Sequence, residues 1–153
     1  MTPGPTGRWS RRVGVLLAVL TLVPLAGCGH GQGYCGAVRD HQSDLGSLAR
    51  GDGRTALLRA LPIFEELRDE APDDVADEWG VVVTRIGALR TALDRAGVEP
   101  ATYDPKHPPP GLSAQERTEI RRAAAELAAT DTREALDTVQ QEVLDVCHTP
   151  LDL

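Results

Sequence analysis

The stretch that decides the fold is VADEWGVVVTRIGALRTALDRAG, residues 75–97. Its apolar side chains recur every three or four residues, which is the period of one helix face. The recurring residues are Val75, Trp79, Val82, Ile86, Leu89, Leu93 and Ala96. Pro72 stands near the expected first turn, and Gly97 follows as a helix stop. The pattern predicts one long helix over 73–96 with a single buried face.

Two more helical arms precede this stretch. Apolar residues at alternating spacings of three and four predict helices over 35–50 and 54–70. Pro62 falls inside the second arm and has no N–H for the Leu58 carbonyl, so we expect a kink there. No stretch of the sequence alternates between apolar and polar residues as a strand would. The expected fold class is therefore all-α.

The last arm, over 113–147, opens with a capping-box pattern formed by Ser113 and Glu116. If its apolar period continued past residue 127, Asp131 would lie in the core. Burying a charged side chain without a partner costs much free energy. The arm is therefore expected to bend, or to divide into two helices, near Thr130. The sequence thus predicts an antiparallel up-down bundle of four arms, the last one broken, which makes five helical segments.

A signal peptide is expected over residues 1–27. The first twelve residues carry three arginines and no acid, and the apolar run VGVLLAVLTLVPLA follows over 13–26. This order is typical of exported proteins, and the run is shorter than the roughly 17–25 residues of a transmembrane helix. Ser10-Arg11-Arg12 also resembles part of a twin-arginine signal. Both the general secretory route and the twin-arginine route therefore stay open.

The leader ends in Leu25-Ala26-Gly27-Cys28, which resembles the bacterial lipobox. The resemblance implies that a diacylglycerol is attached to the Cys28 sulfur and that the chain is cleaved before Cys28. Acyl chains hold a protein on the bilayer because each buried CH₂ contributes about 0.8 kcal/mol. The expected location is the extracytoplasmic face of the cell membrane. The alternative is a plain secretory signal with an incidental cysteine.

Cysteine usage fits an oxidising compartment. Of the three cysteines, Cys35 and Cys147 remain if Cys28 is acylated. We expect a structural Cys35–Cys147 disulfide, with two free thiols or a redox couple as the alternatives. The sequence has no C-x-x-C spacing, which argues against thioredoxin-like chemistry. A flexible tether is expected over 28–33 and one bundle domain over 34–153.

Charge argues against nucleic acid as a partner. The formal net charge of -7 becomes -10 once residues 1–27 are removed, because they hold three arginines and no acid. Such a surface matches phosphates poorly. Acidic residues cluster over 65–78, and the four histidines are His30, His41, His107 and His148. Neither pattern has the spacing of a calcium or zinc site, so we expect no metal and no cofactor.

The segment VEPATYDPKHPPPGL, residues 98–112, holds five prolines and is predicted to be a loop. Tyr103 and the run Pro108, Pro109 and Pro110 are candidates for docking a partner, because prolines form a rigid surface of low conformational entropy. The alternative is a crossover in which the Tyr103 ring merely covers the end of the bundle.

Four strings resemble those of small actinobacterial lipoproteins of unassigned function: YCGAVRDHQ, ALPIFEELRDEAPDDVADEW, AGVEPATYDPKHPPPGLS and DVCHTPLDL. The resemblance spans most of residues 34–153 and implies an exported or membrane-associated protein, with no catalytic residues to carry over.

Two functions remain open. The first is a lipid-anchored interaction or structural module that binds an envelope protein. The second is a small-ligand-binding or hydrolytic protein with a pocket inside the bundle. The sequence contains no Ser-His-Asp order, phosphate-cradling glycine loop or nucleophile elbow, which favours a non-enzymatic protein. A filled core would favour the first function, and an enclosed cavity with converging ionisable groups would favour the second.

Replacing the lipobox cysteine should free the protein from the membrane. We expect Cys28→Ala to appear in the soluble fraction or to keep its leader, because the acyl chains are the expected anchor. Membrane fractionation and intact-mass measurement check this, with Cys147→Ala as the control that stays in the membrane fraction. Wild-type protein with a free, unlipidated Cys28 thiol would contradict the assignment.

Overall fold

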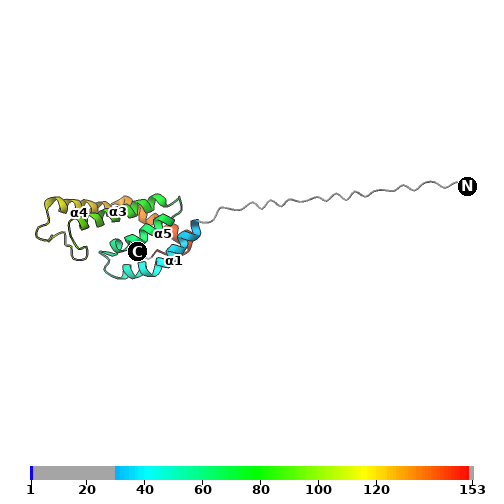
Figure 1. The fold of residues 1–153 in the computed structure, drawn as a ribbon, viewed down its shortest axis with the longest axis horizontal. Helices are drawn as coiled ribbons and strands as arrows, with labels where there is room; N and C mark the ends of the chain where they lie inside the picture. Colours follow the sequence, from blue (N-terminus) through cyan, green and yellow to red (C-terminus); the bar gives the residue numbers. More distant parts are fainter. Residues whose placement is uncertain (2–29, 152–153) are drawn as a thin grey trace.

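The computed structural model of the chain describes Met1 and residues 30–151 (Figure 1). These residues form five helices and no strand: α1 (His30–Arg50), α2 (Ala56–Glu70), α3 (Ala76–Arg95), α4 (Ala114–Leu127) and α5 (Thr130–Cys147). The expected all-α bundle with a broken last arm is confirmed. The signal-peptide prediction and the predicted lipidation site Cys28 fall on residues 2–29, outside the described residues.

The first helix begins earlier than the sequence indicated. α1 starts at His30. The prediction of a flexible tether over 28–33 is therefore wrong for residues 30–33, which belong to the helix. Its glycine-rich start is a poor helix former by itself. Close packing accompanies the extension, because a Cβ placed on Gly33 would lie 2.6 Å from the Glu70 Oε2 at the end of α2. The buried residues Tyr34 and Cys35 follow directly, so the start of α1 adjoins side chains that are packed in the core.

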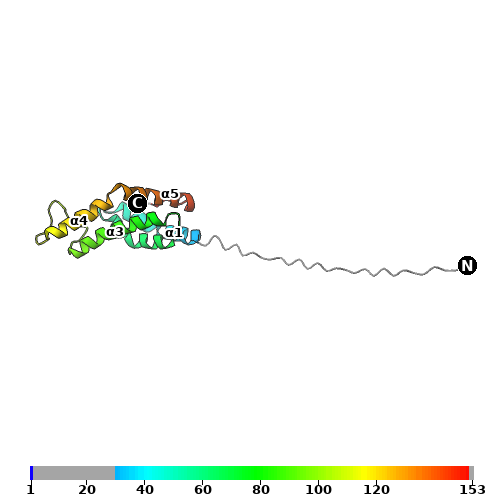
Figure 2. The ribbon, with the colours of Figure 1, turned by 90° about the horizontal axis from the view of Figure 1, so that it is seen from above.

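Packing is organised around α3. This helix contacts α2, α4 and α5, whereas α1 packs against α2 and α5. α4 lies beside α3 at one end of the bundle, while α1 and α5 lie toward the other end, as two perpendicular views agree (Figures 1 and 2). The two halves of the last arm thus cover successive parts of one long helix.

Three aromatic side chains join α1, α2 and α3 in the core. The Trp79 Nε1 donates a hydrogen bond of 2.8 Å to the Tyr34 hydroxyl, and both side chains are fully buried. The Phe64 ring is also fully buried, with its centroid 5.7 Å from that of Trp79. The hydrogen bond removes the penalty that two buried polar atoms would otherwise impose.

The proline in α2 is accommodated by a distant arginine. The helix runs from Ala56 to Glu70 with Pro62 inside it. Pro62 cannot donate to the Leu58 carbonyl oxygen, and the Arg90 Nη2 of α3 donates to that oxygen instead. The carbonyl that proline deprives of its helical donor is therefore bonded across the helix interface.

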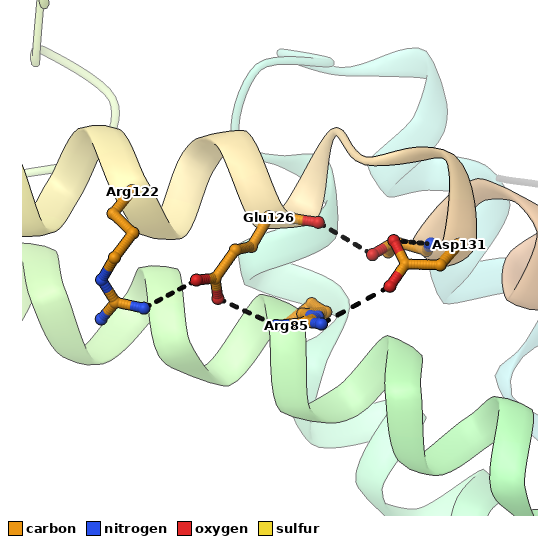
Figure 3. Close-up of polar contacts among 5 residues, drawn as sticks. Arg85, Arg122, Glu126 and Asp131 are labelled. Atoms are coloured by element: carbon orange, nitrogen blue, oxygen red, sulfur yellow. Dashed lines mark hydrogen bonds and ion pairs between the residues drawn. The ribbon is translucent and has the colours of Figure 1, made fainter.

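The break in the last arm is held from α3 (Figure 3). Ala129, in extended conformation, separates α4 from α5. The Arg85 guanidinium lies 2.9 Å from Glu126 Oε2 near the end of α4 and 3.5 Å from Asp131 Oδ2 in the first turn of α5. The buried Thr132 hydroxyl donates a 2.9 Å hydrogen bond to the Glu126 carbonyl oxygen. Thr132 thus bonds a backbone carbonyl that the break leaves without a helical donor, and Arg85 pairs with a carboxylate on each side of the break.

A disulfide joins α1 to the end of α5. Cys35 and Cys147 are bonded, with their Cα atoms 5.2 Å apart, which confirms the expected pairing. Both residues are buried. The bridge lies at the end of the bundle where α1 begins and α5 finishes.

Reduction of this disulfide should destabilise the domain. The bonded cysteines are 112 residues apart, and closing a loop of that length stabilises the folded state by about 5 kcal/mol in the chain-entropy model. Denaturant unfolding with and without a phosphine reductant measures the difference. A Cys35→Ser, Cys147→Ser double variant is the control, because the reductant should not change its midpoint. An unchanged wild-type midpoint would contradict the bridge.

Alkaline pH should destabilise the domain through Tyr34. Burial raises the pKa of its phenol to about 12, opposed by the Trp79 hydrogen bond and assisted by the Glu142 and Asp74 carboxylates. An unfolded tyrosine titrates near pH 10, so above that pH the unfolded chain releases a proton that the folded chain retains. The free energy of unfolding should therefore fall as pH rises from about 10 to about 12.

The matched variant is Tyr34→Phe, which has no proton to lose at this position. Its free energy of unfolding should fall less between about pH 9 and about pH 11.5 than that of the wild type. Equal losses in the two proteins would show that Tyr34 does not carry this pH dependence.

Candidate functional site

A cavity of about 200 Å³ lies where α2, α3, α4 and the 98–112 loop meet. We call it the Tyr103 cavity. Its apolar walls come from all four segments, and the residues are Leu58, Leu89, Leu93, Pro100, Tyr103, Pro105, Ile120 and Ala124. Arg54, just before α2, and Arg121 on α4 complete the lining. The cavity is therefore a feature of one end of the bundle rather than of its centre.

The loop over the cavity is anchored at both ends by buried apolar side chains. Gly97 has a φ of +62°, a left-handed conformation that glycine adopts without strain, and it turns the chain out of α3. The Val98 amide then donates to the Leu93 carbonyl oxygen at 3.0 Å. Val98 and, at the far end of the loop, Leu112 are buried. These contacts hold the loop against the helices.

Tyr103 is half-buried and packs against the core while its side chain lines the cavity. Its amide donates to the Glu99 carbonyl oxygen at 3.1 Å, so the residue sits in a hydrogen-bonded turn. The ring thus has one side against the core and another toward the cavity. Both readings of Tyr103, docking residue and cover of the bundle end, agree with this position.

The proline run lies apart from Tyr103. Pro109 and Pro110 are exposed and Pro108 is half-buried, and among the described residues none of the three lines the cavity. The prolines that flank Tyr103 at the cavity are Pro100 and Pro105. The structure therefore brings Tyr103 together with Pro100 and Pro105 at the cavity, and not with the run of three prolines that the sequence suggested.

The outer part of the loop is polar. The His107 ring lies 2.8 Å from the Asp104 carboxylate, and the Lys106 amide donates to the same carboxylate at 2.8 Å. These bonds, that of His107 first, lower the pKa of Asp104 below its usual value. A polar rim beside an apolar cavity is the usual composition of a contact surface.

The arginines of the cavity were not identified as site residues from the sequence. All of α2, all of α3, the 98–112 loop and the first half of α4 lie between Arg54 and Arg121, so no local motif links them. Leu89 and Leu93 were predicted as members of a core stripe, and they face the cavity from that same stripe. One sequence signal points to the site: the apolar stripe of 73–96 ends directly before a proline-rich loop that contains Tyr103.

The other chemical candidates remain dispersed. His41 contacts Glu66 at 2.9 Å. Residues 30–151 contain no group of three or more histidine, cysteine or carboxylate side chains that could hold a metal ion. In the same range, no helix is both long and apolar enough to cross a membrane.

Comparison of the chain with protein-family models, with curated protein sequences and with solved structures found no match. The resemblance to small lipoproteins therefore remains a prediction from the sequence.

Proposed function

We propose that the protein is an exported, lipid-anchored helical module of the cell envelope that binds a partner protein through the Tyr103 cavity. The observation that carries the proposal is the apolar cavity at the end of the bundle, framed by Tyr103 and two arginines. Pockets with apolar walls and a few polar groups at the edge are the usual receptors for an anchoring side chain of a partner.

The placement of the cavity supports a role in display away from the membrane. α1 begins at His30, two residues after Cys28, so a lipid on Cys28 would hold the start of α1 at the bilayer. Tyr34 near that start contacts Trp79 near the start of α3, whereas the cavity is built on Leu89 and Leu93 near its end. The 20 residues of α3 span about 30 Å. The cavity would then face outward from the membrane.

The chemistry of the walls supports binding rather than catalysis. Apart from the Tyr103 hydroxyl, the polar side-chain groups that line the cavity within the described residues are arginine guanidiniums, which have N–H donors and no acceptor and so cannot act as general bases. A volume of about 200 Å³ is below the roughly 300–1,000 Å³ of typical ligand pockets, and it suits one large side chain.

The alternative is a small-ligand-binding protein that uses the same cavity. Its apolar walls favour this reading as well, because they would shelter a compact apolar molecule from water. The hydrolytic form of the alternative has no supporting residue in the lining. A nucleophile would need an adjacent base, and arginine does not supply one.

Site-specific crosslinking in intact cells tests the proposal. A photoreactive residue in place of the exposed Pro105 should capture one discrete envelope protein. Ala124→Trp, which fills the cavity from an exposed wall position, should abolish the capture. Ala125→Trp is the matched control, because this neighbour is also exposed but lies outside the lining. Capture that survives Ala124→Trp, or that Ala125→Trp abolishes equally, would count against docking in the cavity.

A further inference from the structure

We infer that the partner segment carries an apolar anchor side chain flanked by carboxylates, which Arg54 and Arg121 receive at the edge of the Tyr103 cavity. This inference rests on the proposed function and names the chemistry of the partner. The anchor would enter between the leucines of α3 and the Tyr103 ring. The carboxylates would remain at the edge, where the two arginines lie.

The charge around the cavity is opposite to that of the whole molecule. The chain has 23 acidic and 16 basic residues, a net charge of -7. Yet the charged side chains that line the cavity, among those described, are Arg54 and Arg121. A positive site attracts an acidic segment, and the negative charge of the rest of the molecule repels it. The two effects together favour binding of such a segment at the cavity.

Both guanidiniums have donors to offer. The Arg121 Nη2 donates to the neutral Thr118 hydroxyl at 3.1 Å, and within the described ranges it has no carboxylate within ion-pair distance. Arg54 pairs with Asp52 at 3.4 Å, but its side chain is 80% exposed. An arginine presents five N–H donors in a planar fork that matches a carboxylate, so each can accept a partner group without losing its present bond.

A second cavity of about 240 Å³ adjoins the first and shares Leu58 and Pro100 with it. Its lining holds Asp94 and Glu99 together with Arg59 and Arg90, so its formal charges balance, whereas the charged lining of the Tyr103 cavity is two arginines. An acidic segment would therefore be directed to the Arg121 side of the Tyr103 cavity. The difference in charge between the two cavities therefore sets which way an acidic segment lies across this end of the bundle.

The two tyrosines of the chain provide separate reporters. Tyr103 lines the cavity, whereas Tyr34 is fully buried and bonded to Trp79. Labelling the full chain with 3-fluorotyrosine gives one fluorine signal at the cavity and one in the core. Tyr103→Phe assigns them. The protein is held in phosphatidylcholine nanodiscs, whose neutral surface does not compete for charged peptides.

The probes are blocked pentapeptides with leucine at the centre. The acidic probe is acetyl-Gly-Glu-Leu-Glu-Gly-amide. The matched probes replace both glutamates by glutamine or by lysine, or replace the leucine by serine. The acidic probe should move the Tyr103 signal and leave the Tyr34 signal in place. It should bind about fivefold more tightly than the glutamine probe, as expected for an ion pair at a solvent-exposed edge.

Arginine variants test the source of that preference. Arg121→Gln should remove most of the fivefold difference between the acidic and glutamine probes. Arg39→Gln, an exposed substitution on α1, should retain it and controls for the change in net charge. The serine probe should bind more weakly than the leucine probe, because the apolar walls recognise the anchor.

Several results would overturn the inference. Equal binding of the acidic and glutamine probes would show an apolar receptor without charge recognition, and docking in the cavity would still stand. Hexanoate binding as tightly as the acidic peptide would assign the site to a small acid instead of a protein segment. A Tyr103 signal that none of the probes moves would contradict both the inference and the proposed docking site.

Discussion

The arrangement depends on the break between α4 and α5. As one straight helix, the 34 residues from Ala114 to Cys147 would extend about 51 Å, against about 30 Å for α3. Breaking at residues 128–129 lets both halves pack on α3, and Arg85 connects α3 to the two ends. The break therefore places Cys147 beside Cys35 at one end and α4 beside the loop at the other.

The two ends of the bundle are held together by different kinds of contact. The disulfide end has the buried Tyr34, Trp79 and Phe64 cluster and the covalent bridge. At the cavity end, α4 contributes two buried side chains in the described structure, Ile120 and Ala123, and its main packing partner is α3. α4 is therefore held chiefly through one extensive interface with α3, without a covalent link.

Periodicity was sufficient to predict the helices, and the position of Asp131 was sufficient to predict the break. The pairing of Cys35 with Cys147 followed from counting cysteines. The helical start at His30 was missed because propensity disfavours glycine-rich sequence. The cavity was missed in part because Arg54 and Arg121 come to line the same cavity only through the fold, and because the prolines beside Tyr103 are Pro100 and Pro105. Local patterns carry no information on such long-range contacts.

Amide hydrogen exchange of Arg85→Gln tests most directly whether the link from α3 holds α4 in place. We expect about fivefold faster exchange across α4 and in the first turn of α5, where Asp131 also loses its Arg85 contact. Exchange in the rest of α5, which packs on α1 and α3, should not change. Arg122→Gln is the matched control, because Arg122 contacts the same Glu126 carboxylate from within α4 and makes no link to α3. Exchange in α4 that is unchanged by Arg85→Gln, or raised equally by Arg122→Gln, would contradict the account.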